Sequence, residues 1–87
     1  MLKISEGKKS QRALTLKLEG RVVGPWVEEL RRICEPFLAE DRALRLDLAE
    51  VSYADAEGVA ALNSFKSRGV ELKNCSPFVE QQIKASN

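Results

Sequence analysis

Aliphatic residues at every second position most strongly constrain the fold of this chain. They alternate with polar or charged neighbours in residues 14–18, 44–48 and 70–72, and more briefly in residues 2–4. A period of two is typical of strands with one buried face. A sheet covered on both faces carries continuous apolar runs instead. We therefore expect helices on one face of this sheet and an open, charged face on the other.

Three further segments carry apolar residues every three or four positions, which is the period of an amphipathic helix. The first begins at Pro25, which suits the first helical turn, and Pro36 is expected to kink or end it. The second covers residues 56–67, and the third begins at Pro77 after Ser76 as its N-cap. The expected inward positions are Trp26, Val27, Leu30, Ile33, Cys34, Phe37 and Leu38 in the first, Val59, Ala61, Leu62 and Phe65 in the second, and Phe78, Val79 and Ile83 in the third.

The predicted elements follow the order β-β-α-β-α-β-α, which indicates an α/β fold with a mixed sheet of about four strands. The first two strands, joined by the polar loop of residues 5–12, are expected to pair antiparallel. The later strands are separated by helices, so we expect them to be parallel through right-handed crossovers. The 87 residues contain no repeat, linker or low-complexity segment. Residues 1–87 are therefore interpreted as a single domain.

The composition argues against several functional classes. The net charge is +1 and the charges are interspersed, so neither nucleic acid nor a membrane surface is an expected partner. No apolar run is as long as a membrane span and no signal-peptide pattern opens the chain. We therefore expect a cytoplasmic protein with no direct membrane insertion. The two cysteines, Cys34 and Cys75, lack the spacing of a zinc site.

Catalytic chemistry is not expected either. The chain has no histidine to serve as a general base, no glycine-rich phosphate loop and no metal-ligand cluster. We therefore predict neither enzyme activity nor a cofactor or metal. Asp47 alternates with leucines along a strand, so its carboxylate is expected to lie in solvent on the polar face.

The segment that most invites a function is Asp-Ala-Glu-Gly at residues 55–58, where a strand gives way to a helix. Partners and ligands of open α/β sheets gather at the carboxyl ends of strands, where the next helix begins. Asp55 is expected to be the N-cap of that helix. Glu57 lies in the first turn, where its charge suits the helix dipole. Capping alone accounts for both acids without any further function.

The longer string LRLDLAEVSYADAEGVAALNSF resembles the central motif of STAS domains, the module shared by sulfate transporters and bacterial anti-sigma factor antagonists. The family pattern is a strand ending in Asp-Leu, a short apolar-aromatic stretch, and Asp-Ser-Ser/Ala-Gly opening a helix rich in Leu and Ala. The segments LTLKLEGRV, RGVELKNCSP and VEQQIKAS resemble other parts of the family, so the resemblance extends from Leu14 to Ile83. It implies a STAS-like mixed sheet with helices mainly on one face.

The resemblance matches Asp55 to the family's aspartate and Gly58 to its glycine. It places Ala56 at the position of the serine that a partner kinase phosphorylates in anti-sigma factor antagonists, which switches binding off. Alanine has no hydroxyl, so phosphorylation at this position is excluded. Glu57 adds a permanent negative charge beside it, which leaves open a role as a fixed mimic of phosphoserine.

The resemblance implies a non-catalytic module that binds a protein partner through the face around this turn. Ser52 and Tyr53 carry nearby hydroxyls that do not match the acceptor; taken alone, they are expected to be a loop residue and a half-buried aromatic. The expected partner contacts are Ser52, Tyr53, Asp55, Ala56, Glu57 and Gly58.

Two classes of protein partner are compatible with the resemblance. One is an anti-sigma factor or related kinase, which makes the chain a regulator like an anti-sigma factor antagonist. The other is the ATPase subunit of a bacterial ABC transporter, because small STAS-like proteins also serve as accessory subunits in phospholipid transport. A small-ligand or nucleotide sensor is a third interpretation, but two acids beside the helix N-terminus would repel a phosphate. Whether the chain forms a homodimer stays open.

Overall fold

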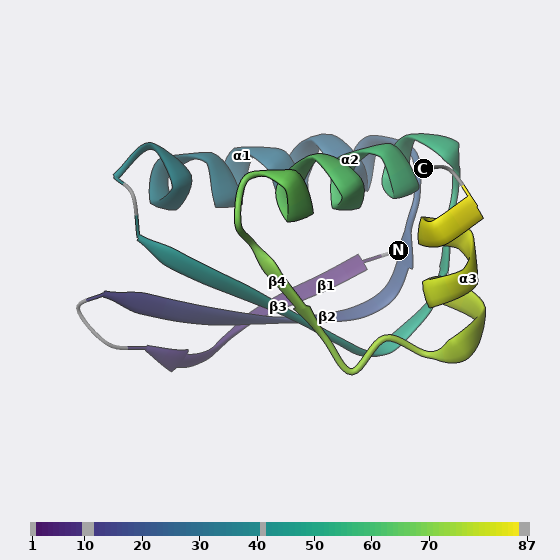
Figure 1. Ribbon diagram of the computed structural model, residues 1–87, viewed down its shortest axis with the longest axis horizontal. Coiled ribbons are helices and arrows are strands. Elements are labelled where there is room, and N and C mark those ends of the chain that lie inside the picture. The colour runs from purple at the N-terminus through teal and green to yellow at the C-terminus, as the bar shows by residue number, and fades with distance from the viewer. Residues whose placement is uncertain (1, 10–11, 41, 86–87) are drawn as a thin grey trace.

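The computed structural model describes residues 2–9, 12–40 and 42–85. Over these residues the elements follow the order predicted from the sequence (Figure 1). They are β1 (Leu2–Lys9), β2 (Ala13–Val22), α1 (Pro25–Ala39), β3 (Ala43–Ala54), α2 (Ala56–Ser67), β4 (Glu71–Lys73) and α3 (Pro77–Ala85). The α/β fold class is therefore confirmed.

The strands form one sheet in the order β1-β2-β3-β4. β1 and β2 run antiparallel, whereas β2 and β3, and β3 and β4, run parallel. A parallel pair needs a crossover connection, and α1 and α2 supply the two crossovers. Both helices lie on the same side of the sheet, while α3 lies at one end of it (Figure 1). The mixed sheet covered mainly on one face is thus the predicted one.

The face of the sheet under α1 and α2 forms the core. The alternating leucines of β2 and β3 point into it, together with inward residues of the helices. The fully buried large side chains are Leu14, Leu16, Leu18, Val22, Leu30, Leu46, Leu48, Leu62, Phe65 and Val79. The opposite face carries charged side chains, among them Arg45 and Glu71, whose Nε and Oε2 atoms form an ion pair at 3.1 Å. That face is open, as expected.

β3 is longer than its period-two segment indicates, because it continues beyond Leu48 to Ala54. Its pairing with β2 takes in one extra residue between Asp47 and Glu50 and another between Val51 and Tyr53. Such bulges bend a strand and change which residues face inward. Here the buried positions after Leu48 are three apart instead of two, at Val51 and Ala54. The prediction that the strand ends at residue 48 is wrong because these bulges break the period.

Other boundaries also differ from expectation. β1 runs to Lys9, so most of the expected polar loop is strand; residues 10 and 11 of that loop lie outside the described residues. An edge strand tolerates polar side chains, which is why composition suggested a loop. β4 covers Glu71–Lys73, one position later than predicted. α1 passes through Pro36 and ends within a turn of it, at Ala39.

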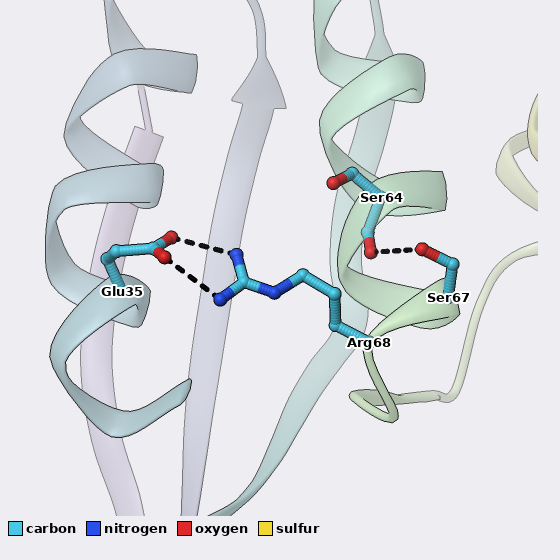
Figure 2. Close-up of polar contacts among 4 residues, drawn as sticks. All are labelled: Glu35, Ser64, Ser67 and Arg68. Carbon is cyan, nitrogen blue, oxygen red and sulfur yellow. Dashed lines mark hydrogen bonds and ion pairs between the residues drawn. The ribbon is translucent and has the colours of Figure 1, made fainter. Parts of the chain in front are cut away.

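An ion pair joins the ends of α1 and α2 (Figure 2). Arg68 Nη1 and Nη2 donate to Glu35 Oε2 and Oε1 at 3.0 and 2.9 Å. These hydrogen bonds hold the pKa of the Glu35 carboxyl below its ordinary value. Ser67 Oγ donates to the Ser64 carbonyl oxygen at 2.7 Å in the last turn of α2. Both ends of the ion pair are exposed, so it orients the helices with little effect on stability.

Candidate functional site

The Asp55 side chain connects the beginnings of α1 and α2. Asp55 is the N-cap of α2, and its Oδ1 accepts a hydrogen bond from the Gly58 N–H at 2.7 Å. Its Oδ2 accepts from the N–H of Gly24, the N-cap of α1, at 2.9 Å. The bond from Gly24, and then that from Gly58, hold the pKa of the Asp55 carboxyl below its ordinary value. The predicted cap is confirmed, and the same carboxylate also fixes the turn to the neighbouring helix.

Gly58 is buried where α2 begins against the end of β2. A Cβ at this position would lie well inside 3.0 Å of the Val22 carbonyl oxygen, a separation that real Cβ atoms do not show. The Asp55 N–H donates to the same oxygen at 3.2 Å. Glycine is therefore required here because the helix backbone approaches the strand backbone closely.

Gln82 connects α3 to the same region through hydrogen bonds. The side-chain Nε2 donates to the Ala54 carbonyl oxygen at 2.8 Å, and Oε1 accepts from the Ala54 N–H at 3.2 Å. The amide thus completes both backbone hydrogen bonds of the last residue of β3, as a further strand would. This contact places α3 directly beside the Asp55 turn.

Phe78 is not an inward residue, so that prediction is wrong. Val79 and Ile83, four positions apart, form the buried face of α3, and Phe78 lies about 100° round the helix from Val79. Its side chain is 59% exposed and stacks on Tyr53 of β3, which is 40% exposed, with ring centroids 6.4 Å apart. Tyr53 is thus partly covered, as expected of a half-buried aromatic, and Phe78 supplies one of its contacts.

The structure brings the predicted site residues together around one turn. Ser52 lies on β3 at the second bulge, not in a loop, and its Oγ donates to the Gly20 carbonyl oxygen at 3.4 Å. Ala56 and Glu57 are exposed in the first turn of α2. Phe78 and Gln82 were missed as neighbours of this turn because no sequence pattern connects α3 to the end of β3.

No group of three His, Cys, Asp or Glu residues among the described positions could hold a metal ion. Burial raises the pKa of the Cys34 thiol to about 12 and also raises that of Cys75, which disfavours their thiolates. In the described part of the chain, no helix has the length and apolar character needed to span a membrane. The turn offers exposed side chains on a fixed backbone, which suits docking.

Comparison with known proteins identifies the family to which the chain belongs. A family model described as "Mlab, STAS domain" matches residues 6–87. The chain therefore belongs to this STAS-domain family, as its motifs indicated. No curated protein sequence matches it.

Solved structures support the same fold. The anti-sigma factor antagonist SpoIIAA in its unphosphorylated form superposes with a TM-score of 0.76 at 14% identity, covering 94% of this chain and 82% of that one. A protein of the DUF3478 family with a SpoIIAA-like fold, from Shewanella loihica PV-4, gives a TM-score of 0.60 at 16% identity, covering 99% and 76%. The fold of the chain is thus that of SpoIIAA.

Proposed function

We propose that this chain is a non-catalytic, cytoplasmic protein-docking module that binds its partner through the turn after β3. The turn surface consists of Ser52, Tyr53, Asp55, Ala56, Glu57 and Gly58. The observation that carries the proposal is that Asp55 accepts hydrogen bonds from the N-cap residue of α1, Gly24, and from the third residue of α2, Gly58. Tyr53, Ala56 and Glu57 are exposed on this fixed turn. A fixed surface loses little conformational entropy when a partner binds, which favours recognition.

In this proposal, phosphorylation does not regulate docking at this surface. Position 56 is alanine, the first residue of α2, and it is exposed where a kinase would need a hydroxyl. A phosphate at a helix N-terminus would add a charge of about −1.5 to −2. Glu57 supplies a single permanent negative charge instead, so the binding state of this turn is not switched.

We predict that the turn accepts no phosphate. Incubating the chain with ATP and a kinase that phosphorylates anti-sigma factor antagonists should leave its intact mass unchanged, since residue 56 has no acceptor. The matched variant Ala56→Ser restores a hydroxyl at an exposed helix start and should take up one phosphate, read by intact mass and peptide mapping. Stoichiometric phosphate on any residue of 52–58 in the unmodified chain would contradict the proposal.

Two classes of partner follow, and they correspond to two biological roles. As an anti-sigma factor antagonist-like regulator, the chain would bind an anti-sigma factor of the kinase type. As an accessory subunit of a bacterial phospholipid-type ABC transporter, it would bind the ATPase subunit. One observation favours the second role: Ala56 removes the phosphorylation switch that regulates anti-sigma factor antagonists.

Capture of the partner separates these roles. The full chain is immobilised, exposed to native lysate, and the retained proteins are identified by mass spectrometry, with Glu57→Lys as the test variant. A transporter ATPase or an anti-sigma factor retained by the wild type and lost by Glu57→Lys supports the corresponding role. Retention of every partner by the variant would show that this turn is not the docking surface.

A further inference from the structure

A shallow hollow adjoins the turn surface on the side of α3. It lies between the end of β3, the first turns of α2 and the last turn of α3. Its lining includes Tyr53, Ala54, Ala56, Val59, Gln82 and Ala85. Asp55 also contributes to it. The small side chains at three of these positions are what leave the space empty.

The lining of this hollow is apolar in character. The Gln82 amide is engaged with the Ala54 backbone, and both Asp55 oxygens accept backbone hydrogen bonds. Apart from the Tyr53 hydroxyl, the polar side-chain groups that line the hollow are therefore directed to internal partners. Such a surface offers contact for an aliphatic or aromatic side chain and little for a polar ligand.

An exposed aromatic pair extends this apolar area. Tyr53 lines the hollow and stacks on Phe78. Among the described residues, these two are the large hydrophobic side chains that are exposed. Aromatic residues of this kind are enriched at the energetic centres of protein interfaces. Their position beside the hollow makes one continuous patch.

The charge next to the hollow is negative. Glu57 follows Ala56 and makes no ion pair with any described side chain. On its other side Glu57 lines a depression between α1 and α2 together with Glu28 and Arg31. Two carboxylates there face one guanidinium, and Asp55 adds a third carboxylate nearby. A complementary partner would therefore carry positive charge beside its apolar contact.

We propose that the hollow between Tyr53 and Ala85 is an anchor pocket for a partner protein. The anchor is a large apolar side chain, and a lysine or arginine beside it faces Glu57. This inference rests on the proposed docking function and specifies the chemistry of the partner. Alanine at position 56 then favours binding, because a phosphorylated serine at this position would place a charge against the apolar anchor side chain.

A peptide selection tests this proposal without knowledge of the partner. A random linear peptide library displayed on phage is panned against the full chain, and affinities of the selected peptides are measured by fluorescence anisotropy. The blocking variant is Ala85→Glu, which introduces a charged side chain at the exposed last residue of α3. Its matched control is Ala39→Glu, at the exposed last residue of α1.

Selected peptides should share a large apolar residue next to Lys or Arg. They should bind the Ala39→Glu variant like the wild type and the Ala85→Glu variant at least about tenfold more weakly, equivalent to ~1.4 kcal/mol. Glu57→Lys should weaken them as well. Equal binding to Ala85→Glu, an acidic consensus or no enriched sequence would each overturn the proposal. So would self-association of the chain that Ala85→Glu abolishes, since the occupant would then be a second copy.

The captured partner separates this inference from the function on which it rests. A partner whose affinity falls with Glu57→Lys but not with Ala85→Glu would refute the anchor pocket and leave docking at the turn intact. A partner insensitive to both variants would refute both.

Discussion

Replacing Gly58 by alanine is expected to destabilise the fold by about 3 kcal/mol, at the upper end of what overpacking costs. The added methyl group would overlap the Val22 carbonyl oxygen, which is backbone and cannot rotate away. α2 would have to move off β2, and the Asp55 hydrogen bond to the Gly58 N–H would be strained. Urea unfolding monitored by far-ultraviolet circular dichroism measures the change.

The sign of this effect is diagnostic because helix propensity predicts the opposite. Alanine is favoured over glycine inside a helix by about 1 kcal/mol, so Gly58→Ala would stabilise α2 if the site had room. Ala60→Gly, at an exposed position of the same helix, is the matched control and should destabilise by ~1 kcal/mol through propensity alone. If the Gly58→Ala chain is as stable as the wild type, the backbone of α2 does not approach β2 as closely as described.

Replacing Asp55 by alanine is expected to lower the melting temperature by roughly 10 °C, the size of effect expected when a helix cap and a second backbone hydrogen bond are lost together. The variant leaves the N–H groups of Gly58 and Gly24 without their carboxylate partner. Asp55→Asn should cost less, because asparagine also caps helices but has only one oxygen to accept. Differential scanning calorimetry gives both values.

The Asp55 contribution should also depend on pH. Its folded-state pKa is lowered, first by the bond from Gly24 and then by that from Gly58, below the unfolded value of about 3.9. The stabilisation is therefore complete above the unfolded pKa and is lost as the pH falls through the lowered folded-state pKa. The difference in melting temperature between wild type and Asp55→Ala should be constant near neutral pH and narrow in acid. If the difference in melting temperature stays the same in strong acid, the charge of Asp55 does not account for its contribution to stability.

The architecture could be predicted because it depends on local patterns. Alternating leucines such as Leu14 and Leu16 determine strands with one buried face, and Asp55 and Pro25 mark helix starts in their immediate sequence. The course of β3 beyond Leu48 could not be predicted in the same way. Its bulges arise from pairing with β2, and a register between strands leaves no period in the sequence of either one.

The location of the turn at residues 55–58 could be predicted from the sequence, but the distant residues that contact it could not. The turn at residues 55–58 combines a cap residue with a glycine, and both signals are local. The bond from Gly24 to Asp55 spans 31 positions and that from Ala54 to Gln82 spans 28, so neither could be inferred from spacing. Hydrophobicity predicts a buried Phe78, whereas the helix phase set by Val79 and Ile83 turns it toward Tyr53.

The central claim, that the chain docks a protein partner through the turn after β3, is tested most directly by isothermal titration of the captured partner. Wild type, Glu57→Lys and the matched charge reversal Glu6→Lys, at an exposed position on the edge strand β1, are compared after thermal melting confirms that each is folded. We predict that Glu57→Lys weakens binding by at least about tenfold, or ~1.4 kcal/mol, and that Glu6→Lys binds like the wild type. Unchanged affinity with Glu57→Lys would contradict the account, and loss of binding in Glu6→Lys would in addition move the docking surface to the edge of the sheet.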